Sequence, residues 1–260
     1  MNDVKLNGRV AIITGGSGGI GRAISIKLAK AGAKVLMLGR DALKGSETEA
    51  RILSLGGNAV FFQVDLLNDK EVACAVGKIL DRYGRVDILV NNAAISGFMG
   101  PVVSTPVEAL ESTLRMNLIS AFYLSSLVLP GMIEHRHGRI INISSVAYKK
   151  NTPNSASYNM SKAGLNTFTK TLSKEVASLG ITVNAVAPGL VLTERIITSR
   201  LPFLAERAGI TADELLSRFE NETDTKRLSN ENDVAELVNF LASPAAQNIT
   251  GSIMDVAGGF

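Results

Sequence analysis

The segment Thr14-Gly-Gly-Ser-Gly-Gly-Ile-Gly21 decides the fold, because it lies between an apolar run at 10–14 and a helical pattern at 20–31. Gly15, Gly19 and Gly21 permit a tight turn, a close approach of the backbone to a pyrophosphate, and close packing of helix on sheet. The start of the helix offers unpaired N–H groups and a positive dipole end to phosphate. Elsewhere such a stretch would indicate only a turn, but here it predicts dinucleotide binding. The predicted contacts from this turn are Gly15, Ser17, Gly19, Ile20 and Gly21.

Short apolar runs alternate with longer segments of helical periodicity through most of the chain. Several of the runs are apolar at nearly every position, which is typical of strands covered on both faces. Repeated β-α-β units with right-handed crossovers predict a parallel sheet between two layers of helices. We predict strands at 10–14, 34–38, 59–64, 86–90, 139–143 and 182–187, and helices at 20–31, 41–55, 69–83, about 106–134 and about 155–179. The expected fold is α/β, a doubly wound, Rossmann-type parallel sheet of seven strands with helices on both faces, in a single domain at 1–260.

Composition excludes several classes of function. The chain has 260 residues, enough for one full hydrophobic core. Its net charge is only +3 and it has no dense basic run, so we expect no nucleic-acid partner. A single cysteine, Cys74, excludes an internal disulfide and fits a reducing compartment. With no signal-peptide pattern and no apolar run of bilayer-spanning length, the sequence predicts a cytoplasmic protein without membrane contact.

The two histidines of the chain do not indicate a metal site. His135 and His137 follow a long helical pattern in a polar stretch, with no cysteine or carboxylate cluster beside them. Zinc sites in proteins are built from sets of such ligands. We therefore predict that both histidines lie on a surface loop and that the protein binds no metal.

The segment at about 190–227 interrupts the alternation of strands and helices. It has a helical pattern at 212–220 but no strand signal, and segments of this length in compact domains are usually functional or disordered. We interpret it as a lid over the active site, with a passive surface excursion as the alternative. Its apolar residues favour an apolar substrate, unless they pack as core or as a subunit contact. These residues are Ile196, Ile197, Leu201, Phe203 and Leu204.

The end of the second predicted strand indicates which nucleotide is bound. An acidic residue there would accept hydrogen bonds from the ribose 2′-hydroxyl of NAD(H). This chain has Gly39 and Arg40 instead, and an arginine can pair with a 2′-phosphate. NADP(H) is therefore favoured, with NAD(H) as the alternative. After the third strand, Asp65 and Leu66 are predicted cofactor contacts. Asp65 is suited either to meet the adenine amino group or to begin the turn before the next helix.

Tyr158 and Lys162 lie four residues apart in a predicted helix, so their side chains share one face. A neighbouring ammonium favours the phenolate and makes the tyrosine a candidate acid or base. The pair alone is a frequent coincidence, but polar residues that follow other strands support it. Asn91-Asn-Ala-Ala94 and Ser144-Ser145 both end predicted strands, and the carboxyl ends of all parallel strands open onto one crevice.

In order and placement these motifs resemble the short-chain dehydrogenase/reductase family. The resemblance rests on Thr14-Gly-x-x-x-Gly-x-Gly21, Asn91-Asn-Ala93, Asn117, Ser145, Tyr158-x-x-x-Lys162 and Pro188-Gly189, and it covers nearly the whole chain. Within the family, Val183-Asn-Ala-Val-Ala-Pro-Gly189 and Asn248-Ile-Thr-Gly251 are most similar to the 3-oxoacyl-[acyl-carrier-protein] reductase-like branch. Two positions depart from the family pattern: Ala94 stands where glycine is frequent, and Ala257 where aspartate is frequent.

The resemblance implies a role for each matching residue. Tyr158 would be the general acid or base, and Lys162 would lower its pKa and bind the nicotinamide ribose. Ser145, rather than Ser144, would polarise the carbonyl group, while Asn117 would hold a water that links Lys162 to solvent. Either Asn117 or Ser145 could instead simply bond to local backbone. Further cofactor contacts are implied at Asn92, Ala93, Pro188, Gly189, Val191 and Thr193.

The implied function is hydride transfer between NADPH and a ketone or secondary alcohol, with a 3-oxoacyl thioester as one candidate substrate. Sugars, polyols, steroids and small diketones are alternatives. A different class of function is a non-catalytic NADP(H)-binding regulator, which would be expected to have lost part of the Asn–Ser–Tyr–Lys set that this chain retains. The resemblance also implies a homotetramer, with interfaces at the helices around 106–134 and 155–179 and at the segment 252–260.

Overall fold

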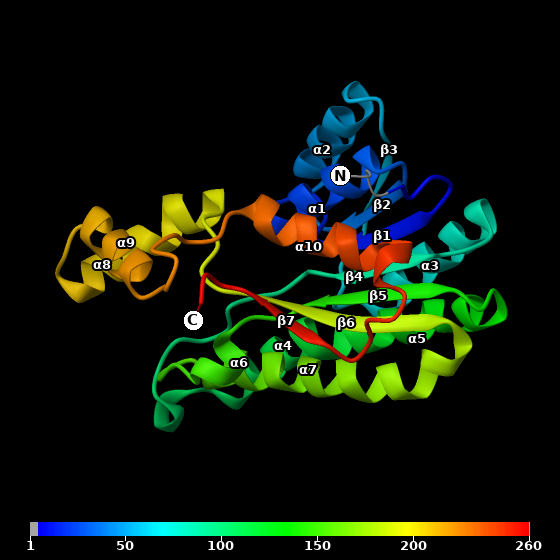
Figure 1. Cartoon of the computed structure of the whole chain (residues 1–260). Helices are drawn as coiled ribbons and strands as arrows, with labels where there is room; N and C mark the ends of the chain where they lie inside the picture. The colour runs from blue at the N-terminus through cyan, green and yellow to red at the C-terminus, as the bar shows by residue number, and fades with distance from the viewer. Residues whose placement is uncertain (1–4, 260) are drawn as a thin grey trace.

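One sheet of seven parallel strands forms the centre of the molecule, in the order β3-β2-β1-β4-β5-β6-β7 (Figure 1). The computed structural model describes residues 5–259; residues 1–4 and Phe260, which the predicted domain and C-terminal interface include, lie outside the described residues. The strand order reverses between β1 and β4, and at such a reversal a crevice opens beyond the carboxyl ends of the strands. The strands are β1 (Val10–Thr14), β2 (Lys34–Gly39), β3 (Asn58–Gln63), β4 (Ile88–Asn91), β5 (Gly138–Ile143), β6 (Ile181–Pro188) and β7 (Ile253–Val256).

Helices cover both faces of the sheet (Figure 1). One face carries α1 (Gly19–Lys30), α2 (Ala42–Ser54) and α10 (Glu231–Ala242). The other carries α3 (Asp69–Tyr83), α4 (Val107–Leu114), α5 (Ser120–Glu134) and α7 (Ala156–Val176), with the short α6 (Ala147–Lys150) at one end. This confirms the predicted doubly wound α/β fold of seven parallel strands.

The sheet is buried on both sides, because its central strands contribute alternate residues to two separate apolar cores. In β1, Ala11 and Ile13 pack with helices α1 and α10, whereas Val10 and Ile12 pack with α3 and α5. All five residues of this strand are buried. A strand covered on both faces needs no polar alternation, which explains the continuous apolar runs in the sequence.

Helix α10 and strand β7 complete the fold, although the sequence pattern did not locate them. Helix α10 begins at a capping box in which Asn230 and Asp233 bond each other's backbone N–H groups. This pairing is a recognisable start signal in the sequence. Strand β7 has only four residues, all at least partly exposed at the edge of the sheet, so its apolar signal is weak.

The helical stretch predicted at 106–134 forms one continuous helix with a π-helical turn, Arg115–Ile119, between α4 and α5. Its length and mean hydropathy of 1.5 would suffice for a membrane span, contrary to the expectation that no apolar run is long enough. In this fold the apolar face of α5 has another partner: Leu124, Val128 and Met132 are buried in the core against the sheet. Core packing therefore accounts for part of the helix's apolar composition.

The segment at about 190–227 extends beyond the end of the sheet (Figure 1). It contains a π-helical turn, Ile196–Arg200, followed by α8 (Leu201–Ala208) and α9 (Ala212–Asn221). A small apolar cluster holds the two helices together. Its members are Leu201, Ala205 and Leu215, with Leu204, Ile210, Ala212, Leu216 and Phe219 packed around them.

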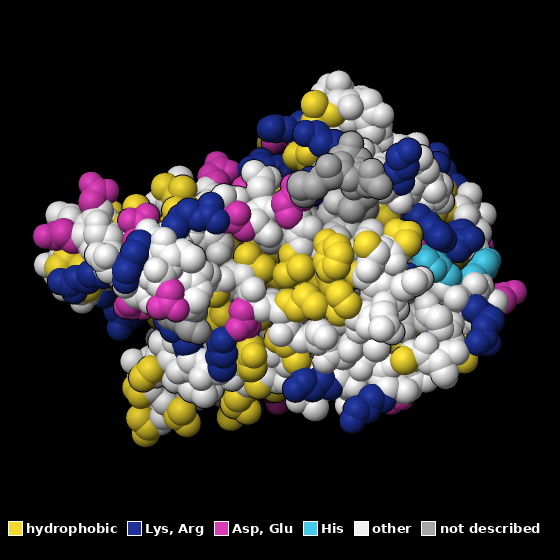
Figure 2. Space-filling model, viewed as in Figure 1, with side chains coloured by type: hydrophobic (Ala, Val, Ile, Leu, Met, Phe, Trp, Pro, Cys, Tyr) yellow, Lys and Arg dark blue, Asp and Glu magenta, His cyan; other side chains and the backbone are white. Residues whose placement is uncertain are grey.

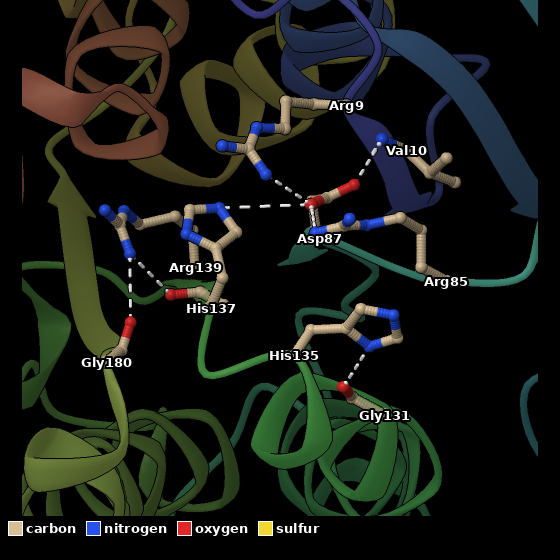
Figure 3. Close-up of polar contacts among 10 residues, drawn as sticks. Arg9, Val10, Arg85, Asp87, Gly131, His135, His137, Arg139 and Gly180 are labelled. Carbon is tan, nitrogen blue, oxygen red and sulfur yellow. Dashed lines mark hydrogen bonds and ion pairs between the residues drawn. The ribbon is translucent and has the colours of Figure 1, made fainter.

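A buried carboxylate at the amino ends of the strands gathers several cations (Figure 3). Asp87 is fully buried and accepts bonds from Arg9 at 2.8 Å, Arg85 at 2.5 Å and the N–H of Val10 at 3.0 Å. The Nε2 atom of His137 lies 3.9 Å from the same carboxylate, and burial together with the nearby arginines lowers the pKa of this histidine to about 4. His137 is thus half-buried rather than on a free loop, whereas His135 is exposed.

Replacing this carboxylate should destabilise the protein. Asp87→Asn leaves the Arg9 and Arg85 guanidinium groups beside an uncharged side chain. We expect a loss of about 2 to 3 kcal/mol in the free energy of unfolding, at the low end for buried pairs because both guanidinium groups reach solvent. Urea unfolding at pH 7 measures this loss. Asp81→Asn, an exposed carboxylate on α3, is the matched control, and equal stability of the two variants would contradict the assignment.

Candidate active site

A cavity of about 760 Å³ opens where the strand order reverses, beyond the ends of β1, β2 and β4. The glycine-rich turn forms one side and the start of segment 190–227 forms another. Eight of the predicted cofactor residues line it. They are Gly15, Ser17, Gly19, Arg40, Leu66, Asn92, Ala93 and Thr193. The sequence therefore located much of this cavity before the structure was known.

The glycine-rich turn has a conformation that only glycine allows at several positions. Gly15 and Gly19 have φ angles of +61° and +48°, in the left-handed region. A Cβ atom on Gly21 would lie 2.1 Å from the carbonyl oxygen of Gly15, which no side chain can tolerate. Helix α1 begins at Gly18 without a side-chain cap, so its first N–H groups are available to a ligand. Ile20, by contrast, packs against the core and Gly21 lies buried beneath the turn.

The ends of β1 and β4 are bonded together through Thr14. Its hydroxyl oxygen accepts hydrogen bonds from the N–H groups of Asn92 at 2.9 Å and Ala93 at 3.0 Å. The Asn92 side chain donates to the carbonyl of Thr14 at 2.8 Å and to that of Gly15 at 3.3 Å. These bonds fix the floor of the cavity against the turn, so Asn92 acts as a positioning residue as well as a lining residue.

Three cations line the cavity near the end of β2. Arg40 was expected there, but sequence analysis missed Arg22 and Lys44. Their sequence positions were a usable signal, because Arg22 directly follows the glycine turn and Lys44 lies four residues after Arg40. Asp65 is not among the lining residues; its side chain accepts a bond from the N–H of Leu67 at 3.0 Å and so begins a turn. This agrees with the alternative interpretation, in which Asp65 begins the turn before the next helix.

Tyr158, from the start of α7, and Ser145, from the end of β5, meet at the carboxyl end of β5. Neither residue is among those that line the cavity, and the same holds for Lys162 and Asn117. The side chains of Tyr158 and Ser145 form a hydrogen bond, which lowers the pKa of Tyr158. Burial of the phenol is the larger influence and raises that pKa overall, while the positive charge of Arg200 lowers it. The Ser145 hydroxyl also accepts a bond from the N–H of Ala147 at 3.2 Å, so local backbone bonding and contact with Tyr158 coexist.

Lys162 lies beneath Tyr158, fully enclosed by protein. Its Nζ atom donates to the carbonyl of Ile143 at 2.7 Å and lies 5.8 Å from the centre of the Tyr158 ring. Burial lowers the pKa of the lysine to about 8. The sequence predicted that Lys162 would lower the pKa of Tyr158, whereas in this structure burial raises that pKa against the smaller lowering effects of Ser145 and Arg200.

Asn117 lies in the π-helical turn between α4 and α5, a rare element that is frequent at functional sites. Its amide exchanges two bonds with the backbone of Ile95, at 2.8 and 2.9 Å, and donates to the hydroxyl of Ser161 at 3.0 Å. Ser161 directly precedes Lys162 in α7. The Asn117 side chain therefore ties the loop after β4 to the helix that carries Tyr158 and Lys162, as the backbone-bonding interpretation expected.

The end of β6 contributes less to the cavity than the sequence predicted. Pro188 and Gly189 form backbone bonds with Val146 and Val256, and a Cβ on Gly189 would meet Ala257 at 3.1 Å. The side chain of Val191 is buried in the core. Of the four residues predicted in this stretch, only Thr193 lines the cavity.

Comparison with known proteins agrees with this geometry. A family model described as short chain dehydrogenase matches residues 9–201. The chain belongs to the short-chain dehydrogenase family. It is 38% identical over 256 residues to the 3-oxoacyl-[acyl-carrier-protein] reductase FabG of Vibrio cholerae, covering 98% of each chain, which confirms the predicted branch.

Two solved structures are also similar along nearly their whole length. A crystal structure of NAD+-bound xylitol dehydrogenase superposes with a TM-score of 0.92 at 28% identity, covering 98% of this chain and 100% of that one. A crystal structure of a single-residue variant of actinorhodin polyketide ketoreductase with NADPH superposes with a TM-score of 0.91 at 33% identity, covering 96% of each chain. As a short-chain dehydrogenase, the protein is an oxidoreductase that acts on carbonyl or alcohol groups with a nicotinamide cofactor.

The buried ammonium of Lys162 should make stability depend on pH. The folded-state pKa is about 8, against 10.5 for an ordinary lysine, so between these values the unfolded chain holds a proton that the folded chain has released. Stability must then rise with pH across this window. Relative to Lys162→Met, the cofactor-free wild type should gain about 3 kcal/mol in unfolding free energy between pH 7 and pH 10.

Urea unfolding at several pH values measures this gain. Lys170→Met, an exposed lysine on the same helix, is the matched control and should follow the wild-type curve. Parallel curves for wild type and Lys162→Met would show that Lys162 is not desolvated in the folded protein.

Proposed function

We propose that the protein is an NADPH-dependent oxidoreductase that transfers hydride between nicotinamide and a ketone or secondary alcohol. The observation that carries this proposal is the hydrogen-bonded pair of Tyr158 and Ser145, with Lys162 one helical turn below, at the same carboxyl side of the sheet as the glycine turn. The cofactor, when bound, supplies the hydride. The side chains of this chain donate and accept the proton at the substrate oxygen.

Tyr158 is suited to act as the acid in the reductive direction. Burial raises the pKa of its phenol, so the group is protonated at neutral pH and has a proton to give. The proton goes to the carbonyl oxygen, which Ser145 also bonds and so polarises. Lys162, with a pKa near 8, can exchange protons close to neutral pH and is placed to restore the phenol. The predicted water at Asn117 would complete this path to solvent.

The charges at the adenosine end support NADP(H). Arg22, Arg40 and Lys44 line the cavity where a 2′-phosphate would lie, and the end of β2 has no carboxylate to bond a 2′-hydroxyl. The NADPH-bound ketoreductase is a similar structure with this cofactor. NAD(H) stays an alternative, because the similar xylitol dehydrogenase structure holds NAD+.

The similarity to FabG supports a 3-oxoacyl thioester as substrate, and the xylitol dehydrogenase likeness supports a polyol. The apolar residues of segment 190–227 give less support to an apolar substrate than the sequence predicted. Leu201 and Leu204 pack within the cluster that joins α8 to α9, while Ile197 and Phe203 are exposed. The apolar residues of segment 190–227 thus stabilise that segment. Its role as a lid rests on Thr193 and its neighbours at the cavity.

We also propose a homotetramer and a cytoplasmic location, as the resemblance and composition predict. Exposed apolar side chains on the two long helices support the first interface: Ile119, Phe122 and Met160 are each at least 40% exposed. Figure 2 shows hydrophobic side chains gathered over β7, which lies in the segment where the second interface is predicted, and over the neighbouring α10. Such surface is unusual on a monomer.

Removing the phenol tests the catalytic assignment. Tyr158→Phe keeps the ring but has no proton to transfer, so kcat for ketone reduction should fall at least about 100-fold with little change in NADPH affinity. Steady-state rates and NADPH fluorescence titration measure the two effects. Tyr83→Phe, at the opposite edge of the sheet, is the matched control. Retained turnover in Tyr158→Phe would remove the tyrosine from this role, and a wild type without turnover would favour the regulator.

Reversing the charge at Arg40 tests the choice of cofactor. Arg40→Asp removes a partner of the 2′-phosphate and adds a repelling carboxylate, so the ratio of kcat/KM for NADPH to that for NADH should fall at least about 100-fold. Arg51→Asp makes the same charge change on α2 outside the cavity and should leave the ratio near that of wild type. An unchanged ratio in Arg40→Asp would place phosphate recognition elsewhere.

A further inference from the structure

Glu231 places a carboxylate beside the glycine-rich turn. It is the first residue of α10, which packs beside α1 (Figure 1). Its Oε1 atom lies 3.8 Å from the position that a Cβ atom on Gly19 would occupy, and Cγ2 of Thr193 lies 3.4 Å from the same position. Thr193 lines the cofactor cavity, whereas Glu231 lines an adjoining groove between α1, α2 and α10, and Arg22 borders both. The carboxylate therefore lies at the first turn of α1, next to the cavity.

No cation neutralises this carboxylate among the described residues. Its Oε1 atom is buried and receives no hydrogen bond, and none of the ion pairs includes Glu231. Glu236, on the same helix, is by contrast paired with Lys27. The capping box of α10 is made by Asn230 and Asp233, so it does not use the Glu231 side chain. A carboxylate oxygen without water or a donor is costly, so another source of positive potential must support it.

The amino end of α1 is that source. Helix α1 has no acidic residue in its first turn and no side-chain cap at Gly18, so its own sequence leaves the positive end of the helix dipole uncompensated. Glu231 supplies the missing negative charge from another helix. The phosphates of a dinucleotide would use the same positive end of α1. The carboxylate and the phosphates thus compete for one favourable potential, and they repel each other when both are present.

We propose that Glu231 sets the affinity for the nicotinamide dinucleotide by holding a negative charge at the helix end that binds its phosphates. The inference rests on the function proposed above, in which the glycine turn holds the cofactor. Binding is then weaker than the turn alone would allow, and the spent cofactor is released more readily. The repulsion acts on the pyrophosphate, which NADPH and NADH share, so it does not select between them.

Removing the charge should tighten the binding of both dinucleotides by a similar factor. In Glu231→Gln and Glu231→Ala, the Kd for NADPH and the Kd for NADH should each fall about 3- to 10-fold at low salt, and their ratio should stay near that of wild type. The difference from wild type should shrink in about 0.5 M NaCl, because salt screens the repulsion. Nicotinamide fluorescence titration of the full-length protein measures each Kd without turnover.

Glu236→Gln is the matched control. It removes the same charge from an exposed position on the same helix, so both Kd values should stay within about 2-fold of wild type. Glu231→Asp keeps the charge and should remain closer to wild type than Glu231→Ala does.

Unchanged Kd values in both Glu231→Gln and Glu231→Ala would overturn the inference and leave the proposed function intact. Tighter binding of NADPH alone would also overturn it, because the charge would then act on the 2′-phosphate. Tighter binding in Glu231→Gln without any in Glu231→Ala would assign the effect to a new amide hydrogen bond instead of lost repulsion. A wild type that binds neither dinucleotide would count against the proposed function itself.

Discussion

The rest of the structure depends on how closely helix α1 crosses the end of β1. Any side chain at Gly21 would overlap the carbonyl of Gly15 and the amide of Asn92, so only hydrogen fits there. This contact directs the helix N-terminus at the crevice and brings β4 against the turn through Thr14. The phosphate end of the site is therefore part of the sheet's own hydrogen bonding, and it needs no flexible loop to form.

Much of the fold follows from local pattern, whereas the details of the site depend on packing. The runs at β1, β4 and β5 are apolar because both faces are covered, and the Gly15–Gly21 turn has one stereochemical solution, so the sequence predicted both. It did not predict that Lys162 would bond the Ile143 carbonyl, or that desolvation would outweigh charge at Tyr158. Those outcomes depend on burial, which residue spacing does not reveal. For the same reason the sequence left two interpretations open for Leu201 and Leu204, and the structure packs them against α9.

Buried charges differ in their partners between the amino ends and the carboxyl ends of the strands. At the amino ends of the strands, Asp87 is surrounded by cations and its bonds join the start of β1 to the approach to β4. At the carboxyl ends, Lys162 and Arg200 have no carboxylate partner among the described residues. Paired charge at the amino ends of the strands stabilises the fold, whereas Lys162 at the carboxyl ends is the unpaired cation to which we assign proton exchange. The charged groups that stabilise the fold and those proposed for the chemistry therefore lie at opposite ends of strands that are about five residues long.

The small cluster that joins α8 to α9 has an evolutionary consequence. Because this segment carries its own apolar contacts, substitutions within it need not disturb either core of the sheet. The glycine turn is constrained by backbone contact, whereas α8 and α9 are held together by a cluster of their own. Sequence change in α8 and α9 can therefore accumulate independently of the glycine turn, and a fold of this kind can vary at this segment while its nucleotide cavity is kept.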